Sequence, residues 1–137
     1  MTPEQIALIE TTFERFYPDH YDAFAQVFYD RLFALDPSLR ALFPDELHEQ
    51  RRKLMMTFNM AVHGMRYPKP LIEGLQRLGK SHAAVGVQPE HYDLVGQALL
   101  STLADYLGEE YTPQVADAWT AAYSLIAESM QQGAVAA

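Results

Sequence analysis

The chain has 137 residues, of which 49% are hydrophobic, and this length suits one domain over residues 1–137 with a single substantial core. Its formal net charge of −8 argues against binding nucleic acid or an anionic membrane surface, since both require basic patches. The chain has no cysteine, which excludes disulfides, thiolate metal sites and cysteine nucleophiles.

Apolar residues recur at steps of three and four along the chain, a spacing that predicts amphipathic helices. In chain order the expected helices span about residues 2–17, 19–34, 36–43, 46–65, 71–85, 89–107 and 112–130. No segment alternates at a period of two over the length of a strand. The prolines fall between these segments or at their first residues, so the sequence predicts an all-α fold of about seven helices.

Residues that begin or end helices sharpen this prediction. Thr2-Pro3-Glu4-Gln5 is typical of a helix start, with a threonine cap and a glutamine that reaches back to it. Asp19 and Asp45 are expected to cap the second and fourth helices. Tyr67-Pro68-Lys69-Pro70 is predicted to break the chain between helices, and the small residues after Gly133 are predicted to fray.

His82 lies at the end of an apolar stripe that Ile72, Leu75, Leu78 and Gly79 form on one face of a helix. A lone histidine on an apolar face usually belongs to the core and bonds a carbonyl, so the residue alone favours a structural role. None of the five histidines has another three or four residues away, so a zinc or di-iron bundle site is not expected.

Tyr29 and Gln50 also interrupt apolar stripes, each on a different helix from His82. Burying a polar group without a partner costs on the order of 1–3 kcal/mol, so three such groups favour a shared pocket. A histidine opposite a tyrosine and a glutamine suits a cofactor with one coordinated face and one hydrogen-bonding face. Nearby, Arg51-Arg52-Lys53 forms a basic cluster, for which charge alone favours a solvent-exposed face over a grip on an anionic ligand group.

Four motifs along the chain resemble those of the globin family. They are FYDRLFALDPSLRALFP (28–44), EQRRKLMM (49–56), LGKSHAAVGVQPEHYDLVG (78–96) and AWTAAYSLIA (118–127). The chain is similar to bacterial single-domain haemoglobins of the Vitreoscilla type and to the haem domain of flavohaemoglobins. The resemblance implies a globin fold, a three-over-three helical sandwich, with haem b as cofactor.

The resemblance also implies a role for individual residues. His82 would be the proximal ligand of the haem iron, Tyr29 and Gln50 would lie on the distal side, and Phe43 would pack flat on the haem. Tyr92 matches a tyrosine that hydrogen-bonds near the proximal histidine, and Lys53 would reach a haem propionate. The other implied haem contacts are Leu54, Phe58, Leu78, Val87 and Val95.

Two positions depart from the flavohaemoglobin pattern. The glutamate that those proteins carry near the end of the last helix, coupled to the proximal histidine, is replaced by Ala134. The lysine that usually precedes the proximal histidine is replaced by Ser81. Peroxidase-like chemistry, which needs an electron-rich iron, is therefore not favoured.

Three functions follow from the resemblance; a haem-based sensor ranks last, and the other two stay open. The first is binding of O₂ with high affinity and slow release, through hydrogen bonds from Tyr29 and Gln50; NO and CO would be further ligands. The second is nitric oxide dioxygenase activity, in which a separate reductase restores the ferrous iron. No run is apolar and long enough to span a bilayer and no signal segment is evident, so a cytoplasmic protein is expected. A monomer is expected, with a weak homodimer as the alternative.

Overall fold

The computed structural model describes residues 1–135, which form six α-helices and two short 3-10 helices. Their bounds are α1 (Pro3–Phe13), α2 (Tyr21–Leu35), η1 (Pro37–Leu42), α3 (His48–Gly64), α4 (Pro68–Ala84), α5 (Pro89–Leu107), η2 (Gly108–Glu110) and α6 (Pro113–Val135). These 135 residues contain no strand, which confirms the all-α prediction. None of their helices combines the length and apolar character needed to cross a membrane.

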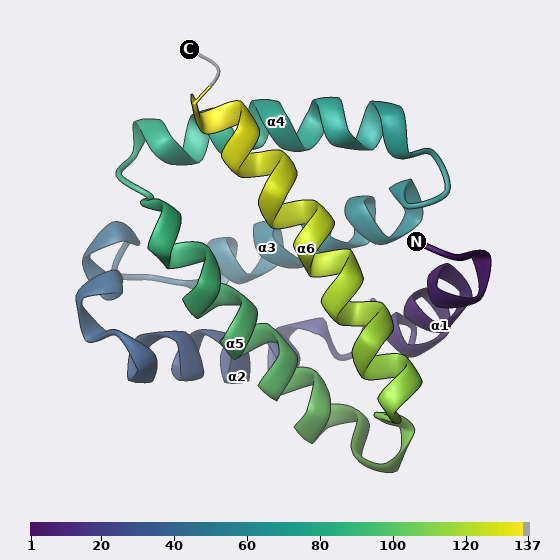
Figure 1. The fold of residues 1–137 in the computed structure, drawn as a ribbon. Coiled ribbons are helices and arrows are strands. Elements are labelled where there is room, and N and C mark those ends of the chain that lie inside the picture. Colours follow the sequence, from purple (N-terminus) through teal and green to yellow (C-terminus); the bar gives the residue numbers. More distant parts are fainter. Residues whose placement is uncertain (136–137) are drawn as a thin grey trace.

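Helices α5 and α6 lie on one side of the molecule and cross over α2, α3 and α4 on the other (Figure 1). Helix α2 packs on α5, α4 crosses α6, and α1 contacts both α6 and α3. The arrangement is a three-over-three helical sandwich, so the predicted globin fold is confirmed.

The lower part of the sandwich is a core of aromatic rings. Phe16 stacks on Phe24 with ring centroids 3.9 Å apart, and Phe13 meets Phe16 edge-on at 5.1 Å. The indole Nε1 of Trp119 donates to Thr12 Oγ1 at 2.9 Å, which satisfies two buried polar groups across α1 and α6.

Two of the three predicted helix caps are wrong. Thr2 forms the expected capping box with Gln5. However, α1 ends at Phe13, and α2 begins after His20 with no side-chain cap, so Asp19 does not cap it. Helix α3 begins after Leu47, and the backbone N–H of His48 is satisfied by the Glu46 carboxylate at 2.9 Å instead of by Asp45.

The segment Tyr67–Pro70 does not separate two helices, because Pro68–Pro70 form the first turn of α4. Backbone N–H groups in a first turn have no partner within the helix, so proline is tolerated there. At the other end of the chain, α6 remains helical through Val135. The prediction that the chain frays after Gly133 is therefore wrong for residues 134–135. The rest of that prediction concerns residues 136–137, which lie outside the described part.

Helices α4 and α6 cross with their backbones almost in contact. A Cβ atom on Gly79 would lie 1.8 Å from the carbonyl oxygen of Met130, and one on Gly133 would lie 1.8 Å from that of Gln76. Only glycine permits this approach from both sides. His82 follows Gly79 by about one helical turn, so the crossing determines where the imidazole lies.

Candidate functional site

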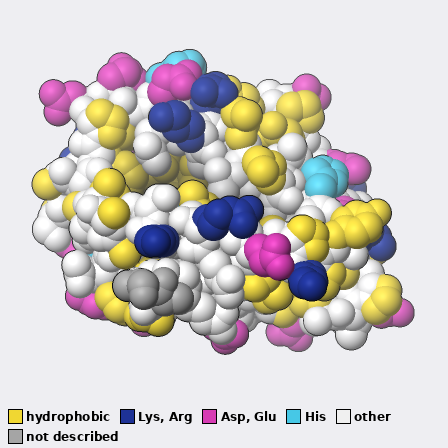
Figure 2. Space-filling view, turned by 90° about the horizontal axis from the view of Figure 1, so that it is seen from above, with side chains coloured by type: hydrophobic (Ala, Val, Ile, Leu, Met, Phe, Trp, Pro, Cys, Tyr) yellow, Lys and Arg dark blue, Asp and Glu magenta, His cyan; other side chains and the backbone are white. Residues whose placement is uncertain are grey.

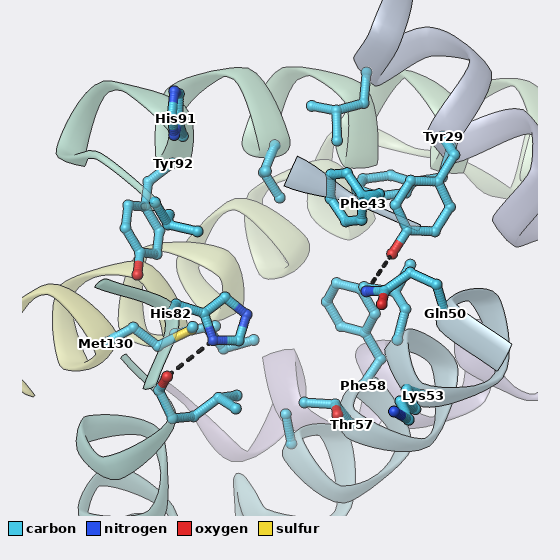
Figure 3. A pocket seen from close by; sticks show the side chains of 18 of the residues that line it. Tyr29, Phe43, Gln50, Lys53, Thr57, Phe58, His82, His91, Tyr92 and Met130 are labelled. Carbon is cyan, nitrogen blue, oxygen red and sulfur yellow. Dashed lines mark hydrogen bonds between the residues drawn. The ribbon is translucent and has the colours of Figure 1, made fainter. Parts of the chain in front are cut away.

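A cavity of about 620 Å³ opens between the two layers of helices, and most of its lining is apolar (Figure 3). All of the site residues that the sequence analysis named lie around it. They are Tyr29, Phe43, Gln50, Lys53, Leu54, Phe58, Leu78, His82, Val87, Tyr92 and Val95. The structure therefore brings together residues from α2, α3, α4 and α5 and from the loops between them.

His82 lies on one side of the cavity and faces Tyr29 and Gln50 on the other (Figure 3). Its Nδ1 lies 2.9 Å from the carbonyl oxygen of Leu78, one turn earlier in α4. Because a carbonyl only accepts, Nδ1 must carry the proton of this bond, which leaves the Nε2 lone pair of the neutral ring free. A ring nitrogen bonded to a backbone carbonyl is also the usual arrangement of a histidine that binds a metal through its other nitrogen.

Tyr29 and Gln50 form a polar pair in the opposite wall. The Gln50 Nε2 donates to the Tyr29 hydroxyl oxygen at 3.2 Å, so the phenolic hydrogen remains free to donate to a third group. The Tyr29 side chain is only 3% exposed, and this burial raises its pKa to about 12 against a small opposing effect of the Gln50 hydrogen bond. The phenol is therefore a neutral hydrogen-bond donor across the physiological pH range.

Phe43 and Phe58 give the cavity flat aromatic walls. Phe43 follows η1 in extended backbone, and its ring meets those of Tyr29 and Phe33 edge-on, each at 5.5 Å. Arg40 fixes this loop, because its guanidinium donates to the carbonyl oxygens of three successive residues. These acceptors are Phe43 at 3.4 Å, Pro44 at 2.7 Å and Asp45 at 2.7 Å.

The three residues of the basic cluster point in different directions. Arg51 is half-buried and pairs with Asp22 at 2.7 Å, away from the cavity. Arg52 lines the cavity, although its guanidinium is paired with Glu49 at 2.8 Å. Lys53 is exposed and also lines the cavity, so its ammonium is available to an anionic group held there.

Helix α6 contributes cavity residues that the sequence analysis did not assign to the site, namely Tyr123, Ile126 and Met130. Figure 3 shows Met130 beside His82, which follows from the close crossing of α4 and α6. The Tyr123 hydroxyl donates to the backbone carbonyl oxygen of Tyr92 at 2.6 Å, and burial raises its pKa. These residues belong to an apolar stripe in the sequence, and no local signal distinguishes a stripe that lines a cavity from one in a filled core.

The cavity fits a flat, largely apolar cofactor that carries a metal ion and peripheral acids. It offers one imidazole nitrogen with a free lone pair, aromatic walls, hydrogen-bond donors opposite the imidazole and a lysine at the rim. Within residues 1–135, no group of three His, Cys, Asp or Glu side chains gathers to hold a bare metal ion. A single imidazole is sufficient when the other ligands come from a tetrapyrrole, as in haem.

Proteins with similar sequences include flavohemoproteins and a neuroglobin. The flavohemoproteins of Bordetella pertussis and Deinococcus radiodurans are 33% and 32% identical to the chain over 93% and 95% of its length. The chain spans about a third of their length, 32% and 33% respectively. The neuroglobin of Tetraodon nigroviridis is 34% identical, and the match covers 78% of this chain and 76% of that protein.

A solved structure shares the fold at lower sequence similarity. The crystal structure of a hexacoordinated heme protein from an anhydrobiotic tardigrade superimposes with a TM-score of 0.87 at 18% identity, over 98% of this chain and 95% of that one. A family model described as Globin matches residues 26–130. The chain therefore belongs to the globin family.

Proposed function

We propose that the chain is a haem b globin that binds O₂ with high affinity and releases it slowly. The observation that carries this proposal is the placement of the free His82 Nε2 across an apolar cavity from the Tyr29–Gln50 pair. When bound, haem would supply the ferrous iron that binds O₂, CO or NO. His82 would hold the iron through Nε2, and Lys53 would pair with a propionate.

The distal residues would determine how long a ligand stays. The Tyr29 hydroxyl and the Gln50 amide would each donate a hydrogen bond to O₂ held in the cavity. Each hydrogen bond to such a polar acceptor would contribute about 1.5–3 kcal/mol, which corresponds to tenfold or more in the rate of release. CO stays less polar than O₂, so it would gain less from the same donors.

The experiment compares Tyr29→Phe with the unchanged protein after each has been loaded with haem. The substitution removes the free donor and keeps the ring, so the O₂ dissociation rate should rise at least about tenfold, while the CO dissociation rate should change much less. Rates are measured by stopped-flow displacement of O₂ with CO. Tyr21→Phe is the matched control, because it lies on the same helix and does not line the cavity.

An O₂ dissociation rate in Tyr29→Phe that equals that of the control would contradict this account of the distal site. If no Soret band develops after addition of haem, the proposal that the chain is a haem globin is contradicted. Both measurements use the purified chain and do not require its physiological partner.

The second candidate is nitric oxide dioxygenase activity with a separate reductase. It is favoured by the similarity to flavohemoproteins. The proposed slow release of O₂ also favours it, because an enzyme that consumes O₂ in its own cavity must hold the O₂ until NO arrives. Steady consumption of NO with formation of nitrate, in the presence of a reductase and NADH, would support it. NO loss limited to a single turnover under those conditions would leave O₂ binding as the function.

A further inference from the structure

The charges of this protein are divided between two regions. The segment that contains α3 and α4, residues 48–84, has seven basic residues and two acidic ones, a net charge of +5. The rest of the chain has three basic and sixteen acidic residues, a net charge of −13, which accounts for the total of −8. The chain is thus acidic overall, but its positive charge is concentrated in this one segment.

Part of the basic segment lies at the cavity. Figure 2 shows Lys and Arg side chains on both sides of a hollow on this face. Arg52 and Lys53 of α3 line the cavity itself, and α4 adds the exposed Lys69, Arg77 and Lys80. We call these five residues, together with the exposed cavity residues Met60 and Val85, the basic face.

Several cations of the basic face have no carboxylate partner. Within residues 1–135, Lys53, Lys69, Arg77 and Lys80 form no ion pair. By contrast, Arg52 pairs with Glu49 in the same helix, and four other arginines pair with carboxylates of distant segments, namely Arg15, Arg31, Arg51 and Arg66. Unpaired cations create a long-range field, since no adjacent anion cancels it. Beside them are exposed apolar side chains that line the cavity, including Met60 at 72% and Val85 at 69% exposure.

We propose that the basic face docks a redox protein whose surface is acidic around its own redox centre. This inference rests on the proposed function, because it assumes that the cavity holds haem. In the docked complex the donor loses one electron and the ferric cofactor gains it, with no bond made or broken in the chain. Unpaired cations would steer and orient the acidic partner, and Met60 and Val85 would supply short-range apolar contact at the cavity mouth.

The probe is a plant-type [2Fe–2S] ferredoxin, a small acidic electron-transfer protein. One variant, Arg77→Gln with Lys80→Gln, removes two positive charges from the basic face without touching the cavity lining. Its matched control, Thr11→Glu with Gln114→Glu, makes the same change in net charge at exposed positions on α1 and α6. Association is measured twice: as binding of oxidised ferredoxin by calorimetry, and as anaerobic reduction of the haem-loaded ferric protein by reduced ferredoxin in stopped flow.

We expect the second-order reduction rate to fall about tenfold between about 20 and about 300 mM NaCl, since salt screens steering. At low salt, the basic-face variant should reduce at least about threefold more slowly and bind at least about threefold more weakly than the control variant. Equal effects of the two variants, or salt-independent rates, would overturn the proposal. So would a variant that loses binding to phosphatidylglycerol vesicles while its ferredoxin kinetics stay unchanged, because the face would then be a lipid surface.

The two proposals can fail separately. If the chain takes up no haem, as judged by the Soret band, the proposed function fails, and this proposal fails with it even if calorimetry still detects ferredoxin. If the chain takes up haem but the variants behave alike, only the docking proposal fails.

Discussion

Tyr29 shows how one buried side chain connects folding to function. Its hydroxyl accepts from Gln50 and keeps its own hydrogen free, which suits it to hold an acceptor in the cavity. The same burial raises the pKa of the phenol to about 12, so the donor stays protonated where it is needed. A group with a different pKa in the folded and unfolded chains also makes stability depend on pH.

We therefore predict a loss of stability at alkaline pH that depends on Tyr29. Below pH 10 the phenol is protonated in both states and its contribution is fully present. As pH rises from 10 toward 12, the unfolded chain releases the proton first, so the free energy of unfolding falls by up to about 3 kcal/mol. Urea titrations of the haem-free protein between pH 8 and pH 11.5 measure this, with Tyr29→Phe showing a smaller fall than the unchanged chain. Equal falls in both proteins would show that Tyr29 titrates normally in the folded state.

At the scale of helices, the crossing of α4 and α6 positions the imidazole. Gly79 has no room for a methyl group because its Cβ would meet the backbone carbonyl of Met130 at 1.8 Å, and backbone yields less than a side chain does. Gly74, on the same helix, offers a comparison, since its Cβ would meet only the Arg77 side chain at 3.8 Å.

We expect Gly79→Ala to separate the two helices and to displace His82. The substitution should lower the free energy of unfolding by at least about 2 kcal/mol and speed the loss of haem, whereas Gly74→Ala should be neutral or raise stability by up to about 1 kcal/mol. Denaturant unfolding and transfer of haem to a scavenger protein measure the two effects. Similar behaviour of the two alanine variants would show that the crossing is more compliant than the structure indicates.

The loop after η1 depends on Arg40 in the same way. Three backbone carbonyls, those of Phe43, Pro44 and Asp45, accept from its guanidinium. Arg40→Gln would lose most of these bonds and free the Phe43 ring, so haem loss should accelerate by about threefold or more. Arg31→Gln is the control, because it removes a pair with the exposed Asp105 of α5. If both variants retain haem equally well, then packing against Tyr29 and Phe33 alone holds Phe43.

For the whole molecule, the sequence predicted features that depend on neighbouring residues. The Thr2 capping box, the helix order and the gathering of polar residues on apolar stripes all follow from spacing over a few positions. The wrong predictions concern helix caps, for which neighbouring side chains compete. For example, the carboxylate of Glu46, and not that of Asp45, accepts from the backbone N–H of His48. The contact of α6 with the cavity was not predicted, and it places Met130 beside His82.

The distribution of charge over the surface also could not be predicted from the net charge of the chain. A net charge of −8 argued against binding nucleic acid or an anionic membrane surface, and the total concealed a segment with a net charge of +5. Composition averages over the surface, whereas the field that a partner meets depends on which elements lie together. The folded structure is needed to see that α3 and α4 concentrate the cations on one face.

The role of His82 in holding haem is tested by a titration of the haem-free protein with haem, followed through the Soret band, for the unchanged chain and for His82→Gly. The unchanged chain should bind one haem. His82→Gly should bind at least about 30-fold more weakly, and added imidazole should restore both the affinity and the spectrum, because it replaces the missing ligand. An unchanged chain that binds no haem, or a His82→Gly variant with the same affinity and spectrum, would contradict the assignment of His82 as the residue that holds the cofactor.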